Sequence, residues 1–364
     1  MIPANLPIDV QCRPLTPLWT GNADKRCDQI RETGLCGSLR WWYEAMLRGS
    51  GLNACDPSRG TCVYEVNKGL ASICHACQLF GCTGYSRRVR IEVVEGGSGP
   101  GELKELRLSN PGNQPHRGWR IPPTCTSSFR LKIVPLFRTG ADTEGLALTF
   151  RLIEKYGAFG AKTSHGQGVV RFQNLPIATH KDWPEQLRQQ VGKNGSEGPG
   201  LSDLVGAIVR LDGAGDGWWQ SLPLREGDLR GFNLSAQSSW LPTSPLIRAM
   251  LRAGLRQPVG INDRHRIMGT IQGWGDPDPQ KKTKGSDVHV THAYRSGAVW
   301  EMRIFAFVPN SSNAGDVAIR TALANADNLA LRIRIALNLG SGPSVTAEPY
   351  PASVRALLDT LERG

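Results

Sequence analysis

Apolar and polar residues follow two different periods in the first half of the chain, one typical of strands and one of helices. Residues 129–134 alternate with a period of two, whereas Leu35, Leu39, Trp42 and Met46 have the spacing of one helix face. We expect strands at 10–16, 88–94, 129–134 and 169–172, and helices at 35–47 and 144–156. The order strand, helix, strand, strand, helix, strand predicts a ferredoxin-like, RRM-like βαββαβ unit.

The second half is less regular but contains the same kinds of segment. We expect helices at 246–255, 314–337 and 352–361, and strands at 266–273, 288–294 and 299–308. The glycine-rich segment 192–200 has the composition of a linker, so one domain is placed at 1–190 and a second, more divergent one at 201–364. The chain is therefore predicted to be an α+β protein of two ferredoxin-like domains.

Two long insertions interrupt the first domain. Residues 95–127 are rich in Gly, Pro, Asn and Ser, a composition typical of an exposed loop. The other insertion, at about 50–85, holds most of the nine cysteines of the chain. So many cysteines in a cytosolic protein favour a metal site over a disulfide framework.

Cys74 and Cys77 have the C-x-x-C spacing of a zinc-binding turn, and Cys55 and Cys62 complete a set of four thiolates. Four protein ligands leave no open position on the metal, so the predicted zinc ion is structural. Cys82 or His75 could replace one of the four ligands. A set of free, half-buried thiols is the alternative to a metal site.

The charge of the chain is strongly positive. Lysine and arginine number 43 against 32 aspartates and glutamates, a net charge of +11, which favours a polyanionic partner, although it also serves solubility. No apolar run approaches the roughly 20 residues that a membrane helix needs, and the first residues lack the pattern of a secretory signal. We therefore expect a cytoplasmic protein that does not bind a membrane.

Two glycine-bearing segments have the composition of phosphate-binding turns. The first contains Gly37, Ser38 and Arg40 at the start of a predicted helix, where backbone N–H groups attract anions. The second is the glycine-rich segment 157–168, in which a backbone without side chains can approach a phosphate chain closely. Its side chains with strong donors are Lys162 and His165. Ordinary tight turns are the alternative for both segments.

Other basic residues are candidates for the same contact. Arg87 and Arg88 lie beside Tyr85 at the entrance of a predicted strand, and arginine on phosphate with tyrosine on a base suits single-stranded RNA. A solvated strand end is the alternative. Lys25 and Arg26, in the loop before the first predicted helix, complete the candidate RNA contacts.

Signatures of common enzymes are lacking in the sequence: it has no paired carboxylates, no Ser-His-Asp order and no Walker-type loop. His165, or His265, His289 or His292 in the second half, could act as a general acid or base in metal-independent RNA cleavage. A zinc-ribbon DNA-binding protein is a third hypothesis, but the predicted helix 35–47 is too apolar to read a DNA groove.

Several of these segments together resemble the RAMP superfamily of CRISPR-associated RNA-binding proteins. Residues 16–21 read Thr-Pro-Leu-Trp-Thr-Gly, and residues 37–42 read Gly-Ser-Leu-Arg-Trp-Trp, similar to the strand and the Gly-Ser/Ala-x-Arg-Trp-Trp helix of that family. The glycine-rich segment 157–168 also has a counterpart there. More narrowly, the chain resembles the first-numbered RAMP subunits of the Cmr, or type III-B, interference complexes, whose bacterial members commonly have a cysteine-bearing insertion like residues 74–88.

This resemblance implies a non-catalytic, RNA-binding subunit of a guide-RNA-bound complex. The subunit would hold the 3′ part of the guide RNA and its paired target RNA at one end of the assembly, beside other RAMP subunits, while another subunit cuts the target. A guide-processing, metal-independent endoribonuclease of the same superfamily is the alternative. By motif position, the resemblance assigns RNA-backbone contacts to Gly37, Ser38, Arg40, Lys162, Thr163 and His165.

Overall fold

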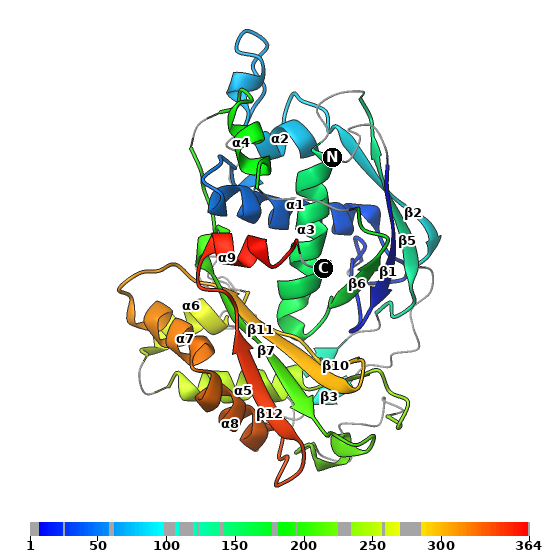
Figure 1. The fold of residues 1–364 in the computed structure, drawn as a ribbon, viewed down its shortest axis with the longest axis vertical. Helices are drawn as coiled ribbons and strands as arrows, with labels where there is room; N and C mark the ends of the chain where they lie inside the picture. The colour runs from blue at the N-terminus through cyan, green and yellow to red at the C-terminus, as the bar shows by residue number, and fades with distance from the viewer. Residues whose placement is uncertain are drawn as a thin grey trace.

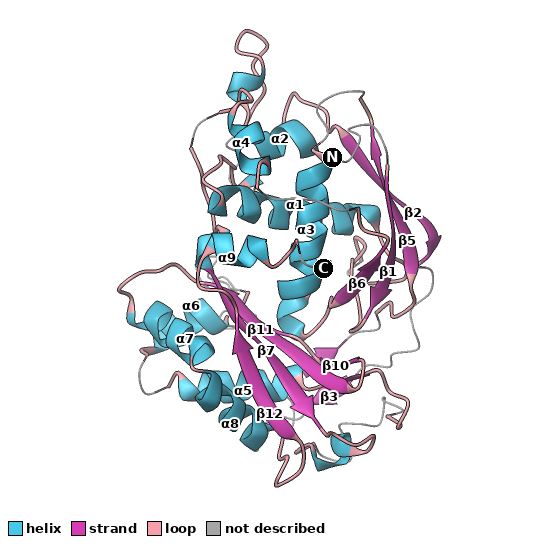
Figure 2. Cartoon of the chain, in the orientation of Figure 1, coloured by secondary structure: helices cyan, strands magenta, loops and turns pink. Residues whose placement is uncertain are grey.

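The structure is a computed structural model of the 364-residue chain. It describes residues 7–24, 26–57, 62–97, 106–108, 119–121, 124–137, 142–176, 181–193, 195–224, 234–256, 259–269 and 285–362. These residues form an α+β fold with one larger antiparallel sheet in each half of the chain (Figures 1 and 2). The predicted α+β class is confirmed.

The first sheet has the strand order β2-β5-β1-β6. Its strands are β1 (Ile8–Pro14), β2 (Val89–Gly96), β5 (Phe129–Pro135) and β6 (Val170–Gln173). Helices α1 (Glu32–Gly49) and α3 (Thr143–Tyr156) pack against this sheet (Figure 1). All six elements predicted for this half are present, with ends shifted by at most three residues.

Local sequence explains why these elements form where they do. In β1, Ile8, Val10 and Cys12 are buried on one face while the residues between them are partly exposed, as expected for a half-buried strand. Asp142 caps the start of helix α3, where its carboxylate accepts the backbone N–H of Gly145 at 2.8 Å and so satisfies one of the free donors of the first turn.

Shorter elements lie around the first sheet. The cysteine-rich insertion contains the short helix α2 (His75–Phe80), and α4 (Trp183–Arg188) follows the last strand. The segment 95–127, expected to be a loop, instead contains an antiparallel pair of strands, β3 (Leu106–Leu108) and β4 (Trp119–Ile121). Each strand has only three residues, too few for an alternating pattern to stand out in the sequence.

The second sheet has the order β12-β7-β11-β10-β8, and β9 also pairs with β11. The strands are β7 (Leu204–Asp212), β8 (Trp240–Leu241), β9 (Val288–Val290), β10 (Ala293–Ser296), β11 (Val299–Phe307) and β12 (Ser344–Pro349). The helices are α5 (Ser244–Gly254), α6 (Ile261–Met268), α7 (Ala314–Ala324), α8 (Ala326–Ala336) and α9 (Val354–Asp359). Strands β7, β8 and β12 were not predicted.

Three predictions for the second half were wrong in detail. The strand expected from residue 266 is instead the last turn of α6, where Ile267 and Met268 are buried, and residues 270–273 lie outside the described residues. The strand 288–294 is divided between β9 and β10. The helix 314–337 is two helices, because the side chain of Asn325 caps the second one by accepting the N–H of Asn328.

Both faces of the second sheet carry buried residues, although the edge strand β12 is largely exposed. One face, including Val209 and Met302, shares a core with α5, α7 and α8. The opposite face presents Phe305 and Phe307 to the first half, where the ring of Phe307 lies 4.6 Å from that of Trp41 and the ring of Phe305 lies 6.0 Å from that of Trp42. The two halves therefore meet through an aromatic contact between β11 and α1.

The C-terminal segment returns to the first half, where α9 lies between α1 and the second sheet (Figure 1). The hydroxyl of Tyr350 donates to the carbonyl of Tyr156 at 2.9 Å, and Lys155 donates to the carbonyl of Thr360 at 2.8 Å. Leu357 and Leu358 belong to the core of the first half. The proposed domain boundaries stay a prediction.

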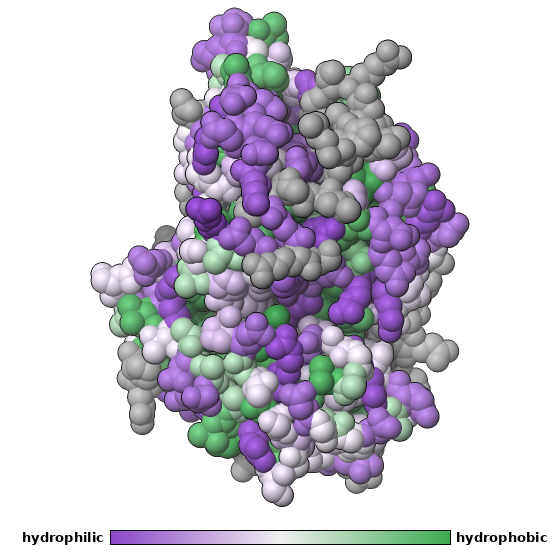
Figure 3. All heavy atoms as spheres, viewed as in Figure 1, coloured by the Kyte–Doolittle hydropathy of each residue, from purple (hydrophilic) through white to green (hydrophobic). Residues whose placement is uncertain are grey.

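The surface seen in Figure 3 is mostly hydrophilic, with apolar residues scattered among polar ones. Among the described residues, no helix combines the length and apolar character that spanning a bilayer requires.

Candidate functional site

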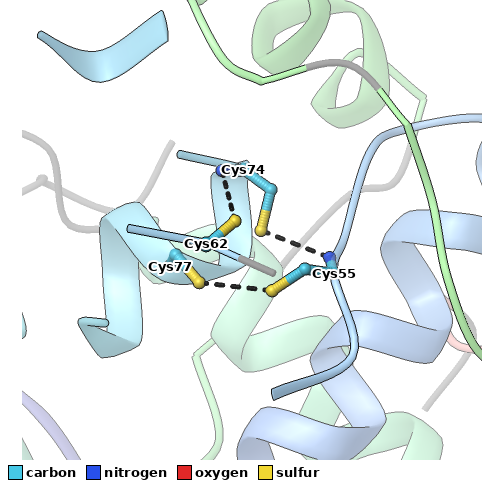
Figure 4. A group of neighbouring side chains, drawn as sticks. All are labelled: Cys55, Cys62, Cys74 and Cys77. Carbon is cyan, nitrogen blue, oxygen red and sulfur yellow. Dashed lines mark hydrogen bonds between the residues drawn. The ribbon is translucent and has the colours of Figure 1, made fainter. Parts of the chain in front are cut away.

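The four predicted cysteine ligands come together in one buried cluster (Figure 4). The Sγ atoms of Cys55, Cys62, Cys74 and Cys77 all lie within 4.8 Å of one another. Cys74 and Cys77 are held by the start of α2, whereas Cys55 follows α1 and Cys62 precedes α2. This arrangement could hold a metal ion, and four convergent thiols are the ligand set of a closed tetrahedral site.

Backbone and side-chain donors surround these sulfur atoms. The N–H of Cys55 points to the Sγ of Cys74, and the N–H of Cys74 to the Sγ of Cys62, both at 3.4 Å. The alternative ligands do not belong to the cluster: Cys82 lies outside it, and the Nε2 of His75 is 3.4 Å from the carbonyl of Gln190.

Three segments noted in the sequence converge elsewhere in the first half. The glycine-rich segment 157–168 pairs with residues 16–21, since Ala161 donates to Trp19 O at 2.8 Å and Gly168 donates to Pro17 O at 2.9 Å. It is also joined to α1, because Ser38 Oγ accepts the N–H of Gly160 at 3.0 Å.

The shape of the glycine-rich segment depends on its glycines. Gly160, Gly166 and Gly168 have φ of +82°, +98° and +93°, values that disfavour other residues. A Cβ at Gly168 would lie 2.2 Å from the carbonyl oxygen of Phe159, and a Cβ at Gly166 would lie 2.6 Å from the ring of His292. Tight packing alone thus accounts for these glycines.

The second half of the chain holds the glycine-rich segment in place. The N–H of His292 donates to Gly166 O at 3.0 Å, and Thr163 Oγ1 is 2.8 Å from His289 Nδ1. The buried guanidinium of Arg303 donates to Gly157 O at 2.7 Å, at the C-terminal end of α3. A cation at this end of a helix meets the negative pole of its dipole.

Lys162 is the positively charged side chain of the glycine-rich segment. Lys162 is half-buried with Nζ 4.3 Å from the ring centre of Trp19, and burial lowers the pKa of the Lys162 amine. Among the described residues it has no carboxylate partner within ion-pair distance. An anion could therefore approach Lys162 without displacing an acidic side chain.

Three histidines near the segment are neutral at pH 7. Burial, together with Arg248 and Lys162, lowers the pKa of His165 to about 4. Burial likewise lowers the pKa values of His289 and His292 to about 3. A neutral imidazole can donate or accept a hydrogen bond, but it has no proton to give as a general acid at pH 7.

The other predicted RNA contacts are spread over the first half. Gly37 is exposed, and a Cβ there would meet nothing within 4 Å. Arg26 and Arg87 are exposed, while Arg88 donates through Nε to Tyr85 Oη at 2.7 Å. Lys25 lies outside the described residues.

The side chain of Arg40 points to the cysteine cluster. Nε donates to Glu44 at 2.7 Å, one terminal nitrogen donates to Gly81 O at 2.9 Å, and the other donates to Cys77 Sγ at 3.2 Å. Each guanidinium nitrogen thus has a partner inside the protein.

Sequence reasoning missed Arg303 and Arg248 as neighbours of the glycine-rich segment. Both are buried; Arg248, which acts electrostatically on His165, donates to Val288 O, and Arg303 donates to Gly157 O. The available signal was a charged residue inside an apolar run, which Arg303 is between Met302 and Ile304.

Comparison with known proteins gives one family and several distant structures. The RAMP superfamily matches residues 11–171. No curated protein matches the chain. Among solved structures, the apo crystal structure of Cmr1 from Pyrococcus furiosus is 14% identical with a TM-score of 0.40, covering 87% of this chain and 97% of that one. A chain in the cryo-EM structure of type III-B Cmr-beta bound to cognate target RNA and AMPPnP is 11% identical with a TM-score of 0.41, covering 88% and 99%.

Both structural similarities are too low to support an argument, so the relation to a known family rests on the match of residues 11–171. The matched stretch contains all three converging segments, 16–21, 37–42 and 157–168. Over residues 11–171, somewhat less than half of the chain, the sequence matches the RAMP superfamily.

Proposed function

We propose that this chain is a non-catalytic, RNA-binding subunit of a type III-B CRISPR RNA-guided complex. It holds the 3′ part of the guide RNA and the paired target RNA, with other RAMP subunits as neighbours in the cytoplasm. The main support is the bond between Ser38 and Gly160, which places the exposed start of α1 beside the glycine-rich segment. The RAMP match over the same residues agrees with this proposal.

A ferredoxin-like fold of both halves is part of the proposal. Numbering the main strands within each half, the first sheet has the order 2-3-1-4 and the second, read from β10 to β12, has the same order. In both halves a helix follows the first strand and another precedes the last. A repeated strand order without a recognisable sequence repeat favours two divergent units of one architecture.

The proposed metal is zinc, held by Cys55, Cys62, Cys74 and Cys77. Buried thiols that converge without forming disulfides fit a four-cysteine zinc site, which has a structural role. Ligation contributes folding free energy to an insertion whose segments have little regular structure of their own.

The proposed RNA contacts are made to the sugar-phosphate backbone. Lys162 supplies a positive charge, Thr163 and His165 supply hydrogen bonds, and Gly37 allows close approach to α1. The exposed Arg26 and Arg87 extend the positive surface. Arg88 extends it as well, with its guanidinium over the rings of Tyr85 and Phe137. Such contacts bind RNA with little sequence readout.

The salt dependence of binding to single-stranded RNA tests this mode. Each lost phosphate contact lowers the slope of log affinity against log salt by about 0.7, so Lys162→Gln should reduce the slope by that amount. Fluorescence anisotropy with several unrelated RNA sequences measures both slope and sequence preference. Binding that is independent of salt, or strong preference for one short sequence, would contradict the proposal.

The endoribonuclease alternative is favoured by one observation, the convergence of His165, His289 and His292 near the glycine-rich segment. Labelled guide and target RNAs incubated with the wild type and His165→Ala, with and without magnesium, distinguish the two functions. We expect no cleavage by either protein. Cleavage that disappears in the variant would replace the binding-subunit proposal by the alternative.

A further inference from the structure

One face of α1 carries a row of three charged residues spaced four apart, the buried Glu44 between the partly buried Arg40 and Arg48. Glu44 lies between the two arginines, 2.7 Å from Arg40 and 3.5 Å from Arg48, with only 1% of its side chain exposed. Residues four apart lie on the same side of a helix. This side faces the cysteine cluster and, at Arg48, also the carbonyl of Pro199, which accepts from Arg48 at 2.8 Å.

Each arginine holds a different part of the cluster. Arg40 donates to Cys77 Sγ at 3.2 Å and to Gly81 O, at the C-terminal end of α2, at 2.9 Å. Arg48 donates to the carbonyl of Cys55 at 2.7 Å and to that of Ala54 at 3.2 Å. The row therefore contacts two of the four cysteines, Cys77 through its sulfur atom and Cys55 through its backbone carbonyl.

The charge of a zinc ion with four thiolates explains why cations belong here. Such a centre has a net charge of −2, which is costly to bury unless positive groups lie close by. Arg40 supplies a positive charge directly on one sulfur, and charge-assisted hydrogen bonds are stronger than neutral ones. Glu44 fixes the orientation of both guanidinium groups.

The same helix contacts the glycine-rich segment. Ser38, two residues before Arg40, accepts the N–H of Gly160 at 3.0 Å. One side of helix α1 thus contacts the cysteine cluster, and another side contacts the glycine-rich segment that is proposed to bind RNA.

We propose that Arg40 is a positioning residue of the metal centre, which stabilises Cys77 as a thiolate ligand, and that it makes no contact with RNA. This inference rests on the metal site of the proposed function. It departs from the assignment of Arg40 to the RNA backbone by motif position.

The test compares metal affinity and RNA binding in the same set of full-length variants. Apparent Kd values for Co²⁺ come from the thiolate-to-cobalt absorption band, and competition with Zn²⁺ gives the zinc affinity. Loss of a group that supports a metal ligand typically costs 10–100-fold in affinity, so Arg40→Gln should weaken Co²⁺ binding about 10-fold or more. Arg40→Lys, which keeps the charge but loses the planar fork, should fall between wild type and Arg40→Gln.

Two matched variants separate the roles. Lys162→Gln should leave the Co²⁺ Kd unchanged and lower the salt slope of RNA binding. Arg90→Gln, on the exposed side of β2, should change neither quantity. Metal-loaded Arg40→Gln should bind RNA with the salt slope of the wild type.

The outcomes are distinguishable. A wild type without stoichiometric metal would overturn both the zinc site and this inference. Metal bound by Arg40→Gln with the Kd of the wild type would overturn only the inference, as would a lowered RNA salt slope in the metal-loaded variant. Circular dichroism shows whether each variant is folded. If Arg40→Gln fails to fold, Arg40→Lys takes its place in the comparison, so the test still gives a result.

Discussion

At the scale of single residues, two glycines in the proposed RNA-binding region differ in what a side chain would meet. Gly166 has φ of +98°, and an added Cβ would lie 2.6 Å from the ring of His292. Gly37 lies in α1 with open space around its Cα. Glycine is therefore required by packing at the first position, whereas at the second it leaves the helix surface open.

Replacing each glycine by alanine tests this difference. Gly166→Ala should lower the free energy of unfolding by about 1–3 kcal/mol, the cost of a strained backbone conformation. Gly37→Ala, the matched control, should raise it by up to about 1 kcal/mol, because alanine favours a helix over glycine. Urea denaturation of both variants measures the two changes, and equal losses would refute the packing argument.

The buried histidines predict how stability depends on pH. Their pKa values, about 4 for His165 and about 3 for His289 and His292, lie below the unfolded value of about 6.5. The unfolded chain therefore binds more protons between about pH 6.5 and 3, so stability is full above about pH 6.5 and falls as the pH is lowered through this range.

His289→Gln should reduce that slope, by at most about 1.4 kcal/mol per pH unit, because it removes one titrating group. His265→Gln, on α6, is the control and should leave most of the slope in place, since burial affects His265 far less. Urea unfolding at three pH values between neutral and mildly acidic provides the comparison. An unchanged slope in His289→Gln would show that His289 is not a buried neutral histidine.

At the scale of elements, the cysteine-rich insertion is held by its ligands and by α1. Helix α2 has six residues, too short to be stable alone. Its contacts include Cys74 and Cys77 within the cluster, and Arg88 N donates to Leu79 O at 2.8 Å. Removal of the metal should therefore loosen α2 first.

Purified protein should contain about one equivalent of zinc, and a chelator should raise hydrogen exchange in residues 70–81 while strand β7 stays protected. Cys77→Ser should have the same effect. Cys82→Ser, outside the cluster, is the control and should keep the metal. Zinc lost equally from both variants would place Cys82 among the ligands.

At the scale of the whole molecule, the two halves share one packed unit. Arg303 in the second half donates to Ile153 O and Gly157 O at the end of α3, and the ring of Phe307 meets that of Trp41. Because the glycine-rich segment starts at Gly157, its position depends on this contact.

Arg303→Gln should destabilise the protein by about 1–3 kcal/mol, because the buried carbonyls of α3 lose their donor. It should also raise hydrogen exchange in residues 157–168. Arg210→Gln on the neighbouring strand is the control, since its partly exposed ion pairs contribute about 0–1 kcal/mol. Similar effects of the two changes would argue against a special role for Arg303.

The sequence by itself determined the elements of the first half and the four cysteines of the cluster. Both are local patterns: apolar periodicity places each helix and strand, and the Cys74–Cys77 spacing brings two thiols together within one turn. Where the pattern was short or interrupted, as at β3, β4, α6 and Asn325, local reasoning failed.

Only the tertiary structure decided which way the charged side chains point and what holds the glycine-rich segment. Arg40 lies close to Ser38 in the sequence pattern, yet its guanidinium contacts Cys77, 37 residues away, instead of the surface that Ser38 faces. Arg303 reaches Gly157 across 146 residues. Such contacts depend on how separate elements pack, and a helix or strand pattern carries no information about the partner that its polar side chains will meet.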